Sequence, residues 1–222
     1  MSVAVTEVLG EVNALGGFFA VGTGEPPAAA RPLRELYATG PGTALARRVA
    51  TVAGRLGTAE PRVAASVVHL GLAARLWSVT LGAAALGGVV PELRPDRTYW
   101  QLPEQGLPEL WVPDPIGAPA SASALHRLVV VEQLTPLAAA VRAAAPVSER
   151  LLWGNAASAL TGASRMLPGP TARGYARDLL TRAPLAGTLT PGLRRRSCCL
   201  YYRLPNGGLC GDCVFTTPPG RA

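Results

Sequence analysis

The chain has 222 residues, 49% of them hydrophobic, and a net charge of +7, which fits one basic globular domain with a sizeable core. Arginine supplies all of the lysine-plus-arginine total of 21, because the sequence contains no lysine. A P-loop, a kinase-type catalytic lysine and Schiff-base chemistry all require lysine, so these enzyme classes are excluded.

Helical patterns dominate the first ninety residues. Apolar spacing and capping signals predict helices over 3–15, from the N-cap Thr43 through Arg55 with a stop near Gly57, from Thr58 through Trp77, and over 81–86. A Gly/Pro-rich connector is expected over 22–32. The spacing of Val63, Val67, Leu70 and Ala74 gives the third helix one buried face.

The middle of the chain has β character. Residues 98–102 and 109–112 are rich in aromatic and branched side chains, and a proline-rich segment separates them. We expect a small antiparallel sheet here, followed by a loop over 113–119.

Helices resume after residue 120. The sequence predicts them over 122–134, over 136–145 with a proline at the start, from the cap Ser148 through Ala163, and over 171–181. The fold class is therefore α+β and mostly helical. A body over 1–192 and a cysteine-rich C-terminal lobe over 193–222 are expected to form one compact unit.

The N-terminal segment and the longest apolar stretch indicate where in the cell the protein is expected. Residues 1–17 contain Glu7 and Glu11 and lack a basic n-region, unlike a secretory signal, so we expect a cytoplasmic protein. His69 and Arg75 interrupt the apolar stretch over 63–90, and the uncharged part that follows is shorter than the roughly 20 residues of a spanning helix. Peripheral contact with a membrane is compatible with this pattern.

The two histidines, His69 and His126, lie in no metal-ligand spacing. The sequence also contains no G-x-S-x-G elbow and no G-x-G-x-x-G fingerprint. Both histidines are expected to be hydrogen-bonded structural residues. Hydrolytic and acid–base chemistry therefore find little support. The four cysteines leave redox chemistry as the reaction type for which the chain carries suitable side chains.

All four cysteines lie near the C-terminus, at Cys198, Cys199, Cys210 and Cys213. Thiolates select iron–sulfur clusters, zinc or copper(I). Structural zinc usually uses two C-x₂₋₄-C elements, and only one is present here. The adjacent residues Cys198 and Cys199 are an awkward pair of ligands for one small ion, because neighbouring side chains in extended backbone point to opposite sides. A cluster spreads its thiolates over two irons, so the spacing favours [2Fe–2S] over zinc. Disulfides allow three pairings but belong mainly to exported proteins.

The residues between the cysteine pairs predict a chain reversal. Leu200–Leu204 has the composition of a short strand, and Pro205-Asn206-Gly207-Gly208 is a strong turn signal. Such a reversal brings Cys210 and Cys213 beside the first pair.

The pattern C-C-x₁₀-C-x₂-C resembles the signature of the FhuF family of siderophore-iron reductases. Leu152–Leu160 resembles the W-G-N segment of that family, and residues 62–66 and 72–77 resemble its N-terminal helical block. The resemblance implies a [2Fe–2S] cluster held by all four cysteines and reduction of ferric siderophores inside the cell. It also points to Trp153 and Asn155 as residues that line a substrate cleft or brace the cluster lobe.

Arg194, Arg195 and Arg196 directly precede the first cysteine pair. They form either a solvated charged loop or a positive rim for an anionic siderophore or an acidic electron donor, such as ferredoxin or a ferredoxin-type reductase. The remaining arginines are scattered and no nucleic-acid motif is present, so a nucleic-acid partner is not expected.

Two other functions compete with the reductase hypothesis. One is a non-enzymatic protein whose cysteines bind zinc and staple the C-terminus. The other is an iron–sulfur redox sensor that binds a partner.

Overall fold

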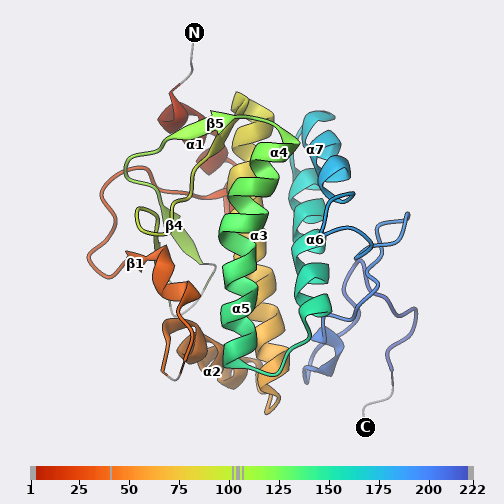
Figure 1. Ribbon diagram of the computed structural model, residues 1–222. Coiled ribbons are helices and arrows are strands. Elements are labelled where there is room, and N and C mark those ends of the chain that lie inside the picture. The colour runs from red at the N-terminus through yellow and green to blue at the C-terminus, as the bar shows by residue number, and fades with distance from the viewer. Residues whose placement is uncertain (1–3, 41, 102, 104–105, 107, 220–222) are drawn as a thin grey trace.

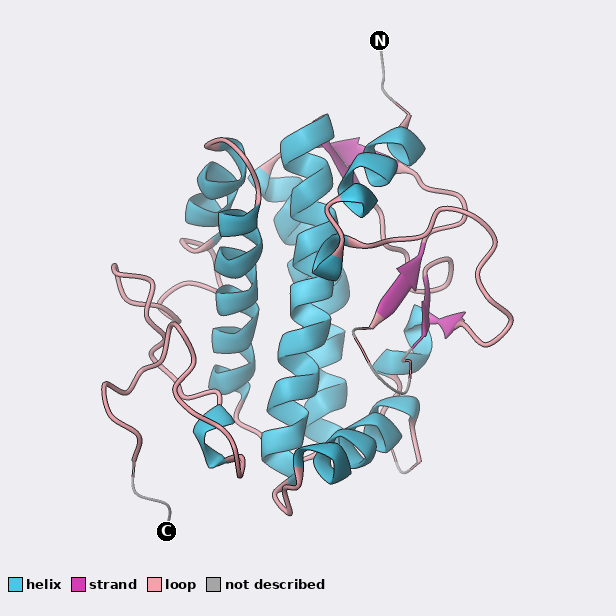
Figure 2. Ribbon diagram, turned by 180° about the vertical axis from the view of Figure 1, so that it is seen from behind, coloured by secondary structure: helices cyan, strands magenta, loops and turns pink. Residues whose placement is uncertain are grey.

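A long central helix organises the molecule. The computed structural model describes residues 4–40, 42–101, 103, 106 and 108–219. Helix α3 (Pro61–Gly87) runs through the middle and packs along α6 (Glu149–Met166), as both ribbon views show (Figures 1 and 2). Trp77 of α3 is fully buried. This helix pair is the frame on which the rest of the chain is arranged.

Four further helical segments surround this pair. They are α1 (Val5–Ala14), α2 (Ala44–Leu56), α7 (Thr171–Leu179) and one long helix made of α4 (Ala122–Leu125), a π-helical stretch (His126–Leu134) and α5 (Thr135–Ala144). The caps of α2 follow the prediction: the Thr43 hydroxyl accepts a hydrogen bond from the Ala46 amide, and Gly57 ends the helix with φ of 60°.

Two predicted helix breaks are wrong. The expected gap after Trp77 is filled because Ser78 and Thr80 are tolerated in a helix, and the Thr80 hydroxyl donates to the Leu76 carbonyl. Helix α3 therefore continues to Gly87, with Gly88 as its C-cap. The expected break before Pro136 is bridged by the π-helical stretch, where the Thr135 hydroxyl donates to the Val130 carbonyl.

Two small antiparallel sheets cover one side of the helices. In the first, β1 (Arg31–Pro32), β3 (Tyr99–Gln101) and β4 (Glu109–Trp111) lie in that order. In the second, β2 (Val89–Pro91) pairs with β5 (Gly117–Pro119). The antiparallel pairing of the two β-like runs is confirmed, and Leu102 lies outside the described residues. The strands β1, β2 and β5 were not predicted: β1 lies at the end of the expected connector over 22–32, and β5 lies in the expected loop over 113–119.

Arg75 explains the charge within the apolar helix α3. Its side chain is buried and donates hydrogen bonds to the carbonyls of Gly17 and Ala20, both at 2.8 Å. These bonds fasten the 3-10 turn Gly17–Phe19 to α3. The charge therefore has a structural role.

Two helices are long and apolar enough to cross a membrane, judged by length and composition alone: α3 and the helix over 122–144. Of their most apolar windows, 78% and 56% are buried inside the molecule. The cysteine lobe lies on the other side of α6 from the sheets, at the blue end of the chain (Figure 1).

Candidate functional site

The cysteine lobe packs against α6 and the N-terminal half of α3. The Ser66 hydroxyl of α3 donates to the Cys199 carbonyl at 2.7 Å, and the ion pair between Glu60 and Arg203, also 2.7 Å, ties the lobe to the start of α3. Segments more than 130 residues apart in the sequence are thereby brought together.

The predicted strand over 200–204 is wrong, whereas the predicted reversal is confirmed. Leu200 adopts left-handed backbone with φ of 67°, which turns its amide toward the Cys198 sulfur at 3.2 Å, and a 3-10 turn over Tyr201–Arg203 follows. At Gly207, a Cβ would lie 2.0 Å from the Tyr201 carbonyl oxygen, so the reversal requires glycine there.

The reversal brings cysteines of the two pairs together. The sulfurs of Cys199 and Cys210 lie 3.5 Å apart. Two sulfurs bound at about 2.3 Å to one tetrahedral metal lie roughly 3.8 Å apart, so this spacing suits shared coordination. All four thiols are free, and the Phe215 amide donates to the Cys213 sulfur at 3.4 Å. Amides directed at cysteine sulfurs are one of the means by which proteins tune clusters.

The thiols differ in acidity. The hydrogen bond with Cys210 lowers the pKa of Cys199 to about 6, and the same bond raises the pKa of Cys210. Burial raises the pKa of Cys198. Arg195 is a positive charge that favours the thiolate form of all three cysteines.

Arg195 is the centre of a buried polar network, which differs from the expected solvent-exposed rim. It is 2% exposed, its Nε donates to both carboxylate oxygens of Asp212 at 3.1 Å, and one terminal amino group donates to the side-chain oxygen Oδ1 of Asn155. The side-chain nitrogen of Asn155 donates to the carbonyl and hydroxyl oxygens of Ser66. The Ser66 hydroxyl in turn donates to the Cys199 carbonyl. Asn155 therefore braces the lobe through hydrogen bonds.

Asp212 completes this network from within the second cysteine pair. Burial opposes its ionisation, but hydrogen bonds from Ser158 and Arg195, with the charge of Arg195, outweigh burial and hold its pKa below the ordinary value. Ser66, Ser158 and Asp212 were not predicted as site residues. The only signal in the sequence was the position of Asp212 between two cysteines.

The other two arginines of the run lie at the surface. The Arg194 guanidinium donates to the backbone carbonyls of Cys213 and Phe215, so it clamps the end of the lobe. Arg196 is exposed, and its Nε donates to the Leu189 carbonyl at 3.3 Å. Only Arg196 keeps most of its guanidinium turned to solvent.

Trp153 is a core residue. Its side chain is buried, and its indole donates to Glu149 at 3.3 Å, one turn earlier on α6. No side-chain hydrogen bond of Trp153 to the cysteine lobe is found among the described residues. Its predicted place at a substrate cleft remains a prediction, without support from its position.

Gly154 sets how closely the lobe approaches α6. A Cβ there would lie 2.4 Å from the Ser197 hydroxyl, which itself donates to the Arg150 carbonyl at 3.2 Å. We predict that Gly154→Leu pushes the lobe from the helix and lowers cluster content at least severalfold. The matched control is Gly162→Leu on the same helix, where nothing lies within 4 Å of the added Cβ. Iron and sulfide assays of both variants check this, and equal cluster content in the two would contradict the role given to Gly154.

His69 is a core residue, as expected, but it is not hydrogen-bonded. Neither ring nitrogen has a partner among the described residues. Burial, assisted by the charge of Arg195, lowers its pKa to about 3. His126, by contrast, contacts the Ala183 carbonyl at 2.7 Å, as a structural histidine would.

The depressed pKa of His69 predicts a loss of stability in mild acid. The unfolded chain binds a proton near pH 6.5 and the folded chain only near pH 3, so the stability present above pH 6.5 falls as the pH is lowered. Between pH 7.5 and 5.5, the unfolding free energy should fall by about 1.4 kcal/mol more than in His69→Leu. Anaerobic urea titrations at both pH values measure this difference, and identical slopes in the two proteins would disprove it.

Two family models match the sequence. The model described as ferric iron reductase FhuF-like transporter matches residues 72–204, which is 133 of the 222 residues. The model described as FhuF 2Fe-2S C-terminal domain matches residues 195–215. The chain belongs to the FhuF-like ferric iron reductase family. No match to the sequence was found among curated proteins.

The match to the 2Fe–2S domain gives this FhuF-like protein its cofactor, a [2Fe–2S] cluster. The matched segment begins at Arg195 and ends at Phe215, so it contains all four cysteines and Asp212. Among the described residues, no three Cys, His, Asp or Glu side chains converge as they would on a single ion.

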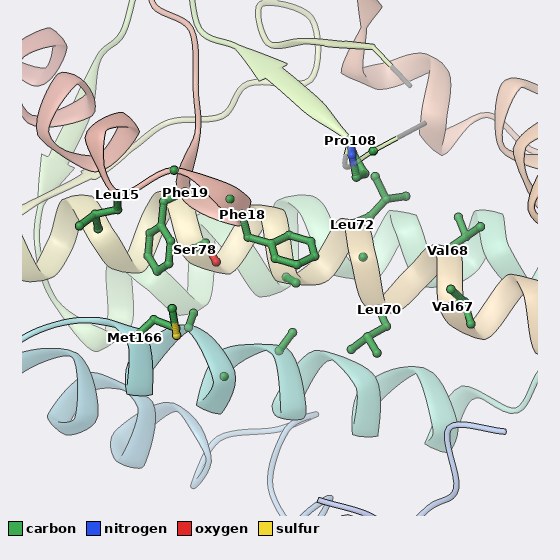
Figure 3. Close-up of a pocket in the computed structure, with 18 of the residues that line it drawn as sticks. Leu15, Phe18, Phe19, Val67, Val68, Leu70, Leu72, Ser78, Pro108 and Met166 are labelled. Carbon is green, nitrogen blue, oxygen red and sulfur yellow. The ribbon is translucent and has the colours of Figure 1, made fainter. Parts of the chain in front are cut away.

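A large apolar cavity of about 870 Å³ lies in the groove between α3 and α6 (Figure 3). Phe19 and Met166 lie on opposite sides of it, Phe18 lies further along α3, and Val67 lies at one end. Among the described residues that line it, Arg48 is the only charged one, and none of the four cysteines is among them.

Proposed function

We propose that this FhuF-like protein is a cytoplasmic [2Fe–2S] reductase of ferric siderophores, with Cys198, Cys199, Cys210 and Cys213 as the cluster ligands. The family supports iron reduction in general, and siderophore-bound Fe(III) is the specific substrate proposed here. The proposal rests mainly on the segment 195–215. This segment matches a 2Fe–2S domain and contains four free thiols, two of which have their sulfurs 3.5 Å apart.

The cluster supplies one electron at a time. A donor such as ferredoxin or a ferredoxin-type reductase provides that electron, and Fe(III) in the chelate accepts it to become Fe(II). Reduction removes one positive charge from the iron, so its attraction to the hard oxygens of the siderophore falls and release becomes easier.

The role of the protein is to hold the sulfurs and to set their electrostatic surroundings. The buried guanidinium of Arg195 keeps a positive charge beside the thiolates, which favours an added electron. Ser66 and Asn155 fix the lobe against the two central helices, which limits movement of the ligands when the charge changes.

An anaerobic mixing experiment tests the function. The dithionite-reduced protein, freed of excess reductant, is mixed with a ferric siderophore while the visible spectrum is followed and Fe(II) is trapped with a ferrous-specific chelator. Prompt reoxidation with one Fe(II) formed per cluster is expected. A cluster that stays reduced would contradict the reductase and favour the redox sensor, and a colourless protein that contains zinc would favour the structural zinc protein.

A further inference from the structure

A second cavity lies beside the cysteine lobe and is lined by four arginines. Its volume is about 660 Å³, within the range of small-molecule sites. Arg165 comes from the last turn of α6, Arg173 and Arg177 come from α7, and Arg196 comes from the segment that leads to the cysteines. No aspartate or glutamate is among the described residues that line it.

The positive charge of this cavity is not neutralised within the chain. All four arginines are exposed, and among the described residues none of the four takes part in an ion pair. Arg173 and Arg177 are also four residues apart on one helix, an arrangement of like charges that destabilises a helix. The cavity therefore offers guanidinium groups that an anionic ligand would neutralise.

The wall of the cavity continues directly into the cysteine lobe. The Arg196 amide donates to the Thr188 carbonyl at 2.9 Å, and its Nε donates to the carbonyl of Leu189, another lining residue. Arg196 is two residues before Cys198, so their Cα atoms are at most about 7 Å apart. Thr161, which also lines the cavity, is one turn beyond Ser158, the partner of Asp212.

We propose that this arginine-lined cavity binds the ferric substrate and that it selects chelates with net negative charge, such as tris(catecholate) complexes, over neutral tris(hydroxamate) complexes. The inference rests on the proposed reductase function and specifies its substrate class. The cavity combines arginines with apolar residues such as Leu185 and Leu189, which suits a chelate with an organic body and anionic oxygens. The iron would then lie beside the segment that carries the cysteines.

Binding is tested separately from electron transfer with gallium(III), which cannot accept the electron. Equilibrium dialysis measures binding of Ga(III) tris(catecholate) and of a neutral Ga(III) tris(hydroxamate) to the oxidised holoprotein. The test variant is Arg173→Gln/Arg177→Gln, which changes two exposed side chains. The control is Arg127→Gln/Arg142→Gln, which removes the same charge from two exposed ion pairs outside the cavity.

The test variant should weaken binding of the anionic complex on the order of tenfold or more, while the control changes it little. With the iron(III) complex, KM should rise in the same proportion, with kcat and the cluster spectrum unchanged. Equal weakening by both variants, or none by the test variant, would overturn the proposal. It would also be overturned if the test variant kept chelate binding and instead slowed reduction by a ferredoxin, because the cavity would then receive the donor. Arginine-dependent gallium binding in a protein that never reduces iron would support the cavity and contradict the reductase.

Discussion

Serine at Cys198 or at Cys210 is expected to abolish the cluster and the iron-reducing activity together. A serine hydroxyl is a hard, weakly acidic ligand, whereas iron–sulfur clusters depend on soft thiolates. Each substitution removes one of four proposed ligands, one from each half of the lobe. The visible spectrum, the iron and sulfide content and the rate of Fe(II) formation in anaerobically prepared protein all measure the effect.

The matched control for the cysteine variants is Ser197→Ala, next to Cys198. This change removes only the hydrogen bond to the Arg150 carbonyl, so cluster content should stay near that of the unchanged protein. A complete cluster in either serine variant would show that the ligand set proposed here is wrong.

Arg195→Met is expected to destabilise the protein by about 3–5 kcal/mol, because it removes one partner of a buried ion pair and leaves Asp212 without its charge partner. The Arg195 side chain is 1% exposed and that of Asp212 12% exposed, so water replaces little of the lost interaction. The control is Arg127→Met, whose ion pair with Glu132 has a similar distance of 3.0 Å at the surface. That pair should contribute at most about 1 kcal/mol.

The charges of Arg195 and Asp212 are also expected to shift the reduction potential of the cluster. A purely structural ion pair would not have this effect. Arg195→Met should lower the reduction potential of the cluster, because a positive charge near the sulfurs is lost, and Asp212→Asn should raise it, because a negative charge is lost. Urea unfolding and anaerobic redox titration measure the two effects. Shifts of the same sign in both variants, or a stability loss no larger than that of the control, would contradict the network described here.

Much of the helical framework could be predicted because its signals are local. Thr43 and Gly57 bound α2 as their capping chemistry indicates, and the antiparallel strands follow from aromatic and branched residues. The two missed helix connections, after Trp77 and before Pro136, depend on hydroxyl groups that bond back to the helix and on a π-helical stretch. Neither feature produces a clear hydrophobic periodicity in the sequence.

The cysteines of the candidate site could be identified from spacing, and their surroundings could not. Arg195 looks like one member of an exposed charge run, yet the fold buries it against Asp212 and Asn155. Ser66 is 133 residues from Cys199, and nothing local links the two. Arg165, Arg173 and Arg177 look scattered in the sequence and meet only because α6 and α7 pack together. The surroundings of the cysteines depend on contacts between segments that are distant in the sequence, which local patterns do not reveal.

The most direct test of the account is the electron-paramagnetic-resonance spectrum of the anaerobically purified protein after reduction, combined with assays for iron and acid-labile sulfide. The account predicts two irons and two sulfides per chain and the signal of a reduced [2Fe–2S] cluster. Protein that contains no labile sulfide, even after reconstitution with iron and sulfide, would contradict it.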